Sequence, residues 1–392
     1  MRYGRIGGIF LLILLGCSDN SPVDPIVEQP LTGKTVEEQF AGRIEINNLP
    51  NYANQEVPEY IQKDNSGFNP ITNEGAILGR VLFYDKNLSF DNSKSCSSCH
   101  QQKFAFSDTA KVSRGVEGGV TKRHAMRLIN ARFGEEQAFF WDERAATLET
   151  QTSMPIKDHD ELGYSGLEGR PGYSDLLKKL QAIRYYNELF KLVFGDSVIT
   201  ETRMQRALAQ FVRSIQSFDS RYDEGYAQYF ANFTEEEKRG LSLFTALPSA
   251  ELEGGINVRK VGGVGCFFCH RPPEFDIRPT TGNNGVVGVA NKPLENDFNV
   301  TRAPSLRNIA NPAGVLNGPL MHDASITSFE DLIATVGKLE PNPANINLEL
   351  VLRPGYDFKI TDQEASDLIA FLKTLSGNAV YTDERWSDPF EP

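Results

Sequence analysis

The stretch Ser93–Asp108 reads SKSCSSCHQQKFAFSD, and Gly263–Phe275 reads GVGCFFCHRPPEF. Each contains the pattern C-x-x-C-H, formed by Cys96, Cys99 and His100 in the first copy and by Cys266, Cys269 and His270 in the second. This pattern is the attachment signal for c-type haem, in which two thiols bond to one porphyrin and the histidine binds its iron. The chain is therefore predicted to hold two covalent haem groups, with His100 and His270 as metal ligands.

Paired cysteines also serve two other chemistries. A redox-active pair needs no histidine after it and usually belongs to a βαβ unit. A zinc site would join both pairs in a single four-thiolate cluster. The chain has five cysteines, and the two motifs use four of them. The histidine that follows each pair favours haem over both alternatives.

The first twenty residues, MRYGRIGGIFLLILLGCSDN, have the layout of a secretion signal, with two arginines before a short apolar run. That run is too short for a permanent transmembrane helix. The end of it, LLGC, resembles the bacterial lipobox, in which the cysteine is lipidated; an ordinary signal peptide with a chance cysteine is the alternative. We expect residues 1–16 to be a lipoprotein signal peptide, Cys17 to anchor the protein in the periplasm or at the outer membrane, and residues 17–58 to be a tether.

The composition is that of a soluble globular protein. The chain has 392 residues, enough for two domains, of which 40% are hydrophobic and 23% are charged. Its net charge of −12 argues against nucleic-acid binding, because an acidic protein repels phosphates. The same charge would attract a basic protein partner, although acidity more often serves solubility alone.

The surroundings of the two motifs repeat as well. The matched segments are GRVLF (79–83) with GLSLF (240–244), LIN with LRN, WDERAATLE (141–149) with HDASITSFE (322–330), and LAQFVRSI (208–215) with LIAFLKTL (368–375). The last pair has apolar residues at helical spacing, and strand signals are weak throughout the chain. We expect a mainly α fold with two cytochrome-c-like haem domains related by internal duplication, at residues 59–225 and 226–392.

These segments resemble those of the bacterial di-haem cytochrome c peroxidase family, which includes the MauG-type enzymes. The resemblance covers nearly everything after the tether and rests on NPITNEGAILGRVLFYDKNLSFDNSKSCSSCH, FFWDERAATLETQTSMPIKDHDELG, CFFCH, APSLRN, LMHDAS and ITDQEASDLIAFLKTLSG. It implies that the N-terminal haem reduces hydrogen peroxide to water. It also implies that the C-terminal haem receives electrons from a small donor, a cytochrome c or a copper protein, and that the protein could form a homodimer.

The same resemblance implies the catalytic residues. The carboxylate of Glu161 would accept and return protons over the first iron, with Gln151 and Pro155 beside it. Trp141 would carry electrons between the haems. Each residue has a plainer interpretation, since a glutamate before Leu-Gly is most often a solvated loop residue and a tryptophan is most often part of a core.

The first haem site departs from the family pattern. Many members carry a removable histidine in the loop after the first motif, but the corresponding position falls near Val116, and no histidine follows until His124. We expect the first haem to be open, with His124 as a substitute ligand in the alternative. His124 also replaces an asparagine of the family's inter-haem calcium site, whose other ligands are backbone oxygens of residues 301–308. A bound calcium ion is still one of the expectations, because backbone carbonyl oxygens alone can serve as its ligands.

The second haem site departs more sharply. Pro155 lies six residues after Glu149, and the matching residue six after Glu330 is Val336. In the family this position supplies the distal iron ligand, methionine in many peroxidases and tyrosine in the MauG type, whereas valine cannot bind iron. Met321 is the nearest methionine candidate, with core packing as the alternative role.

Three functions remain open at this point. The first is a peroxidase supplied with electrons by a small periplasmic protein. The second is a MauG-like oxidase that modifies a protein or a small molecule, which an open first haem favours and Val336 disfavours. The third is an electron-transfer cytochrome without catalysis, against which Glu161 and Gln151 argue.

Overall fold

The computed structural model describes residues 31–390 apart from five gaps, which are 135–137, 278–282, 284, 301 and 340–354. The predicted signal peptide and the lipid-attachment residue Cys17 lie outside the described residues. In the ranges that the structure does describe, no helix has both the length and the apolar character needed to cross a bilayer.

The fold is rich in helices, as predicted, with one small sheet. The helices are α1 (Val36–Phe40), α2 (Asn73–Tyr84), α3 (Leu148–Lys157), α4 (Tyr173–Gln181), α5 (Arg184–Phe194), α6 (Glu201–Ser214), α7 (Arg221–Tyr226), α8 (Glu235–Thr245), α9 (Phe329–Val336), α10 (Asp362–Lys373) and α11 (Ala379–Thr382). The sheet has the order β1-β2-β6-β5, formed by Pro248–Glu253, Ile256–Gly262, Tyr356–Asp357 and Lys338–Leu339. Strands β3 (His270–Arg271) and β4 (Asp276–Ile277) form a separate antiparallel pair.

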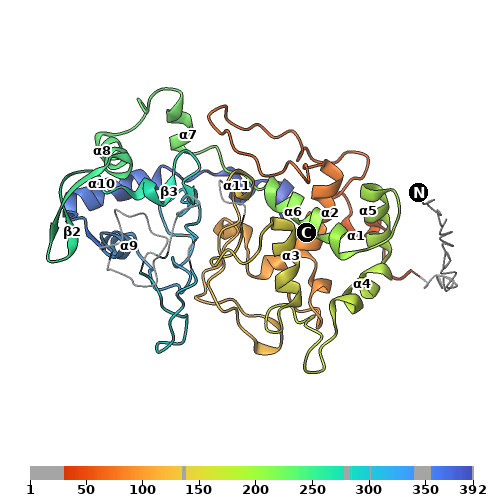
Figure 1. Cartoon of the computed structure of the whole chain (residues 1–392). Coiled ribbons are helices and arrows are strands. Elements are labelled where there is room, and N and C mark those ends of the chain that lie inside the picture. Colours follow the sequence, from red (N-terminus) through yellow and green to blue (C-terminus); the bar gives the residue numbers. More distant parts are fainter. Residues whose placement is uncertain are drawn as a thin grey trace, which may run out of the picture. The chain divides into compact units, whose positions relative to one another are not determined.

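A pair of crossing helices forms the centre of each of two hydrophobic cores. The first core surrounds α2 and α6, and the second surrounds α8 and α10. Figure 1 shows α2, α3 and α6 in one group and α8, α9 and α10 in another. The helices begin at well-formed caps, because the side chains of Thr72, Thr200, Thr234 and Thr361 each accept a hydrogen bond from a backbone N–H in the first turn.

Both helix pairs make the same close approach at a glycine. A Cβ atom on Gly79 of α2 would overlap the carbonyl oxygen of Ala207 and lie 2.7 Å from the Cβ of Phe211 on α6. A Cβ atom on Gly240 of α8 would overlap the carbonyl oxygen of Asp367 and lie 2.7 Å from the Cβ of Phe371 on α10. Only glycine allows the two backbones to come this close.

The chain also repeats its loop geometry at the matched segments. Asn130 and Asn308 both adopt left-handed backbone conformations, with φ of 55° and 47°. The N–H of Asn130 donates to the carbonyl of Ile215 over 2.9 Å, and that of Asn308 donates to the carbonyl of Leu375 over 3.0 Å. Antiparallel bridges join Phe139 to Ala145 around Trp141, and Leu320 to Ile326 around His322. Each bridge begins two residues before the matched residue and ends four residues after it.

The predicted tether extends too far along the chain. Helix α1 begins at a capping box between Thr35 and Glu38, and its Val36 and Phe40 are fully buried in the first core. Tyr52 is fully buried as well, and its hydroxyl donates to the carbonyl of Arg385 over 2.5 Å. The apolar residues of this segment recur every four positions, which is a helical spacing within an otherwise polar stretch.

Both ends of the predicted second domain also need correction. Its predicted start at residue 226 falls at the end of α7, whose Tyr222 is already buried in the second core. At its other end, Val380 and Trp386 are buried in the first core. The hydroxyl of Tyr84 donates to the carbonyl of Trp386 over 2.6 Å, and Figure 1 places the C-terminus among α1, α2 and α3. The chain therefore returns to its first half before it ends.

Replacing Trp386 by alanine tests this return of the chain. The side chain is 1% exposed, so Trp386→Ala should lower the free energy of unfolding by about 3–5 kcal/mol, the usual effect of removing a large buried aromatic side chain. Denaturant unfolding followed by circular dichroism would measure the change. Leu294→Ala is the control, because Leu294 is 97% exposed and its truncation should change stability by less than about 0.5 kcal/mol. Equal stability of the two variants would contradict the placement of Trp386.

Candidate haem sites

The first C-x-x-C-H motif forms a short turn against α2. The segment Cys96–Ser98 is a 3₁₀ helix, and it contacts α2. The ring of His100 is held through Nδ1, which lies 3.1 Å from the carbonyl oxygen of Phe106. Because a carbonyl can only accept, Nδ1 carries the ring proton and Nε2 keeps its lone pair. Burial lowers the pKa of His100, so the ring is neutral, as a metal ligand must be.

The second motif repeats this arrangement. The segment Cys266–Phe268 is a 3₁₀ helix that contacts α8, and Nδ1 of His270 lies 3.4 Å from the carbonyl oxygen of Phe275. Phe106 and Phe275 both have positive φ, of 59° and 54°, which turns their carbonyls toward the histidines. Both motifs thus present a buried, neutral imidazole beside a pair of thiols that form no disulfide.

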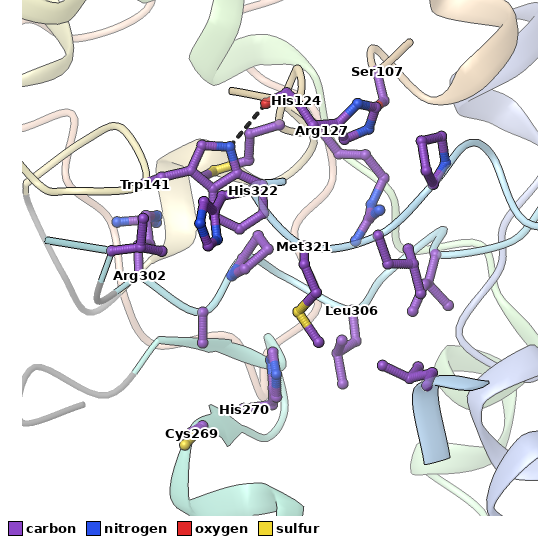
Figure 2. A pocket seen from close by; sticks show the side chains of 18 of the residues that line it. Ser107, His124, Arg127, Trp141, Cys269, His270, Arg302, Leu306, Met321 and His322 are labelled. Carbon is purple, nitrogen blue, oxygen red and sulfur yellow. Dashed lines mark hydrogen bonds between the residues drawn. The ribbon is translucent and has the colours of Figure 1, made fainter. Parts of the chain in front are cut away.

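A cavity with mostly apolar walls lies beside the second motif. Its lining includes the side chains of Val300, Leu306, Ile309, Leu320, Leu332 and Val336, together with Cys269 and His270 of the motif. Figure 2 shows His270 and Cys269 at one side of this cavity, below Met321 and Leu306. Apolar walls, a thiol and an imidazole are what a covalently bound porphyrin requires.

The zinc alternative is wrong. The two cysteine pairs lie in different cores, one against α2 and the other against α8. Among the residues that the structure describes, which include all four motif cysteines, no three cysteine, histidine, aspartate or glutamate side chains come together as a metal-binding group. The residues at each motif fit haem instead.

The distal wall of the second cavity contains both residues that the sequence singled out. Val336 at the end of α9 lines the cavity, as the register of the repeat predicts, and offers no atom that could bind iron. Met321 lines the same cavity from a left-handed position, with φ of 67°. Figure 2 shows its thioether side chain extending to the side where His270 lies. Met321 is thus partly core and partly cavity wall.

The residues predicted at the peroxide site lie on α3 and the loop that follows it. Gln151 and Pro155 lie one turn apart on α3, which begins at the N-cap Thr147. The loop then folds back, because the N–H of Leu162 donates to the carbonyl of Pro155 over 3.3 Å. Glu161 therefore lies next to the end of α3, with its own N–H directed at the carboxylate of Asp158 over 3.3 Å.

The carboxyl group of Glu161 is poised to exchange a proton near neutral pH. Burial, reinforced by the charge of Asp158, raises the pKa of Glu161 to about 7, against the opposing charges of Arg144 and Lys122. The charge of Glu161 acts in turn on the first motif, since after burial it contributes to raising the pKa of Cys99 to about 11. The charge of Glu161 is therefore close enough to the first motif to act on Cys99.

The loop around Val116, where many family members carry a removable histidine, is hydrogen-bonded to the loop that contains Glu161. The N–H of Val116 lies 3.2 Å from the carbonyl oxygens of both Asp160 and Glu161. Val116 itself is 1% exposed, and a Cβ atom on Gly115 would overlap the carbonyl oxygen of Asp160. This loop packs on the Glu161 loop through its backbone, and it contains no histidine before His124.

Both ring nitrogens of His124 have hydrogen-bond partners in the structure. Its Nδ1 lies 2.9 Å from the carbonyl oxygen of Ala110, and its Nε2 lies 3.4 Å from Oγ of Ser107. Ser107 follows Phe106, so the ring contacts the segment that holds His100 rather than the loop that carries Glu161. Burial lowers the pKa of His124 to about 4, which keeps the ring neutral.

Trp141 lies at the junction between the two halves. It is buried, and its indole N–H donates to the carbonyl of His124 over 2.8 Å (Figure 2). Its ring packs edge-on against His322, with 6.2 Å between the ring centroids. The N–H of His124 donates to the carbonyl of His322 over 2.8 Å, so the three residues form one connected group. Trp141 also lines the cavity of the second motif, which suits the predicted role between the haems.

Two arginines in this region were not found by sequence reasoning. Arg302 donates to the carbonyl of Ala138 over 2.6 Å and pairs with Asp276 over 3.2 Å. Arg127 donates to the carbonyl of Ser305 over 3.0 Å, and burial lowers its pKa to about 10. Both line the cavity of the second motif (Figure 2). Nothing in the local pattern distinguishes them from surface arginines, because their burial depends on segments far away in the chain.

Comparisons with known proteins show the family to which the chain belongs. A family model described as di-haem cytochrome c peroxidase matches residues 73–229. The methylamine utilization protein MauG of Methylophilus methylotrophus is 30% identical over 322 residues, which cover 80% of this chain and 85% of that protein. The cytochrome c551 peroxidase of Nitrosomonas europaea is 29% identical over 318 residues, covering 77% and 80%. A crystal structure of a MauG-like protein associated with microbial copper homeostasis has a TM-score of 0.65 at 28% identity, covering 86% of this chain and 99% of that one.

Because the two motifs lie in separate cores, each should hold its own haem. Replacing Cys96 and Cys99 together by serine should remove one of two covalent haems, leaving the second attached through Cys266 and Cys269. Intact-protein mass spectrometry and haem staining of the denatured protein would count the groups. The reciprocal double variant in the second motif is the matched control. A chain that lost both haems, or neither, from one double substitution would contradict independent sites.

Proposed function

Since the chain belongs to the di-haem cytochrome c peroxidase family, we propose that it reduces hydrogen peroxide to water with electrons from a small periplasmic redox protein. The family includes peroxidases and MauG-type oxidases alike. The observation that carries the proposal is Glu161, a half-buried carboxyl group with a pKa of about 7 whose charge acts on Cys99 of the first motif. The predicted catalytic set of Glu161, Gln151 and Pro155 suits peroxide chemistry and has no use in a cytochrome that only transfers electrons.

Glu161 would supply the proton transfers of the reaction. Hydrogen peroxide takes up two protons and two electrons and yields two water molecules. The bound haem would supply the iron that binds peroxide and the path by which electrons reach it. The ionised carboxylate would take the proton from one peroxide oxygen and return it to the oxygen that leaves, a pattern that suits a pKa near the working pH. Gln151 would orient the peroxide by hydrogen bonding, and Pro155 would exclude water from the same face.

Trp141 would connect the two haem sites. Its indole N–H reaches the carbonyl of His124, and the ring of His124 contacts Ser107, next to the carbonyl that holds His100. At its other side Trp141 lines the cavity that contains His270. An electron given to the second haem would therefore pass through one buried indole to reach the first.

A MauG-like oxidase that modifies a protein or a small molecule is the second candidate. One observation favours it. The loop that contains Val116 is hydrogen-bonded to the Glu161 loop and has no histidine that could occupy the sixth coordination position of the first iron. An oxidase would consume peroxide while its own substrate, rather than a donor protein, supplies the electrons. Steady-state peroxide consumption with a reduced small cytochrome c or copper protein separates the two functions.

The two halves, we infer, arose by internal duplication. Support comes from the shared glycine contacts at Gly79 and Gly240, the left-handed asparagines Asn130 and Asn308, and the equal bridges beside Trp141 and His322. Position 141 in the first half corresponds to position 322 in the second. The two rings that meet at the junction are therefore matched residues of the repeat.

The remaining parts of the proposal rest on the sequence. A lipid anchor at Cys17 would hold the protein in the periplasm or at the outer membrane, as its only attachment to a membrane. The acidic chain suits a basic electron donor and is a poor match for nucleic acid. A homodimer is the expected assembly if the protein follows its dimeric relatives.

The pH dependence of the peroxide reaction tests the role of Glu161. Below about pH 7 its carboxyl group keeps its proton and cannot accept one from peroxide. The second-order rate constant, measured by stopped-flow absorbance, should therefore fall about tenfold for each pH unit below 7. Glu161→Gln should lower the rate at pH 8 by about 10²–10⁴-fold and abolish the pH dependence.

Asp158→Asn provides the matched control. Asparagine keeps the oxygen that accepts from the N–H of Glu161 but removes the negative charge that helps to raise the pKa of Glu161. The variant should keep the rate at pH 8 and move the acidic limb to lower pH. A wild-type rate that does not change between pH 5.5 and 8 would exclude Glu161 as the proton acceptor.

Met321 is the proposed distal ligand of the second haem. Met321→Leu should convert this haem from low spin to high spin and lower its reduction potential, since a methionine ligand raises the potential. Optical and electron paramagnetic resonance spectra of the oxidised protein would detect the change. Met126→Leu is the matched control, because Met126 lines the same cavity and is not proposed as a ligand. If only the Met126 variant altered the spectrum, the assignment would be wrong.

A further inference from the structure

Arg127 is a cation without an anionic partner at the junction of the two halves. Its Nη2 donates to the carbonyl of Ser305 over 3.0 Å, and its buried Nε has no hydrogen-bond partner among the described residues. None of the ion pairs in the described part of the chain includes it. Figure 2 shows the side chain reaching down the wall of the cavity that contains His270.

The neighbouring arginines are all paired. Arg123 donates to Asp142 and Asp297 over 2.6 and 2.7 Å. The other two pairs are Arg302 with Asp276 and Arg307 with Asp223. A buried charge is ordinarily paired, because taking an ion out of water is unfavourable unless another charge compensates it. Arg127 differs from the other three in facing the cavity with an unused donor.

The chemistry of the cavity indicates what the partner is. A porphyrin attached through Cys266 and Cys269 carries two propionate carboxylates, and no carboxylate of the described residues lines this cavity. A guanidinium group presents its donors in a planar fork that suits a carboxylate. Its fixed charge would also stabilise whichever iron state carries the additional electron.

Calcium does not fit the same region. The ion takes six to eight oxygen ligands, and at the position of the family's asparagine this chain has His124, whose ring contacts Ala110 and Ser107. The carbonyl of Ser305, in the segment expected to supply backbone oxygens, accepts a hydrogen bond from Arg127. A guanidinium group at this place repels a divalent cation.

We propose that Arg127 binds a propionate of the second haem and raises its reduction potential, and that this arginine replaces calcium as the fixed positive charge between the haems. The proposal rests on the haem binding proposed above. It concerns the resting protein before any peroxide is added. Its outcome is therefore independent of whether the enzyme is a peroxidase or an oxidase.

The test is a spectroelectrochemical titration of the full-length di-haem protein without peroxide. The second haem is the one whose transition survives in the Cys96→Ser, Cys99→Ser variant. Arg127→Gln should shift its reduction equilibrium toward the oxidised form at least tenfold, or about 59 mV for one electron. Arg127→Lys should keep most of the wild-type potential at pH 7. Arg206→Gln, which makes the same charge change at an exposed position, should shift neither haem.

The lysine variant keeps the test decisive even if the glutamine variant does not fold. An ammonium group in this cavity loses its proton more readily than a guanidinium group. The potential of the second haem in Arg127→Lys should therefore fall between pH 7 and pH 10 by more than it does in the wild type. Equal potentials in all variants, or equal loss in the lysine and glutamine variants at pH 7, would overturn the role of the charge.

Calcium itself is the last probe. Adding calcium or a chelator to the wild-type protein should leave both potentials and both optical spectra unchanged. A calcium-dependent shift in either would overturn the replacement of calcium by Arg127.

Discussion

The contact between two helix backbones at one glycine sets the geometry of each half. At Gly79 and again at Gly240, the facing helix comes so close that any side chain would overlap its carbonyl oxygen. The turn that contains each C-x-x-C-H motif contacts the glycine-bearing helix, so its position depends on this approach. In both halves the chain continues from that turn to the motif histidine, then to the carbonyl that contacts it, and then to the left-handed asparagine. The two haem sites therefore have the same arrangement of helices and turns and differ in the residues of their distal walls.

The differences lie on the distal sides. In the first half, Gln151 and Pro155 lie on α3, and the following loop, which contains Glu161, is hydrogen-bonded to Val116. On the second side, α9 ends in Val336, and Met321 enters from a left-handed turn. The charge of a titratable carboxyl group therefore acts on one motif, and a thioether lies among the apolar walls beside the other. Under the proposed function, the same helix framework would support a site for proton transfer and a site for electron storage.

Local patterns in the sequence were enough to predict those parts of the fold in which the contacting residues are close together in the chain. The two haem-binding turns, the helical nature of the repeat and the register of Val336 all followed from short spacings. The packing of Val36 and Phe40 was missed because four-residue spacing in a polar segment becomes visible only when a core is present to receive it. Trp386 was missed because it packs with a segment some three hundred positions earlier.

The candidate site divides in the same way. The family resemblance indicated Gln151, Pro155 and Glu161, but α3 and the loop that folds back onto it were seen only in the structure. No spacing in the sequence could identify Arg127, because its lack of an ion-pair partner among the described residues depends on where the fold places distant carboxylates. The same holds for His124, whose ring is fixed by Ala110 and Ser107 through loop closure. Ion pairs and ring contacts between segments that are far apart in the sequence cannot be predicted from local patterns and become visible only in the folded structure.

The burial of Trp386 in the first core has a consequence for the order of assembly. Ribosomes make the segment that contains Cys96 and Cys99 long before the residues that complete its core. Until those residues are made, the first core lacks Val380 and Trp386, whereas the second core contains residues from Tyr222 to Leu375 and none from the final segment. The first core can therefore be completed only after the second, when the C-terminal segment has been made.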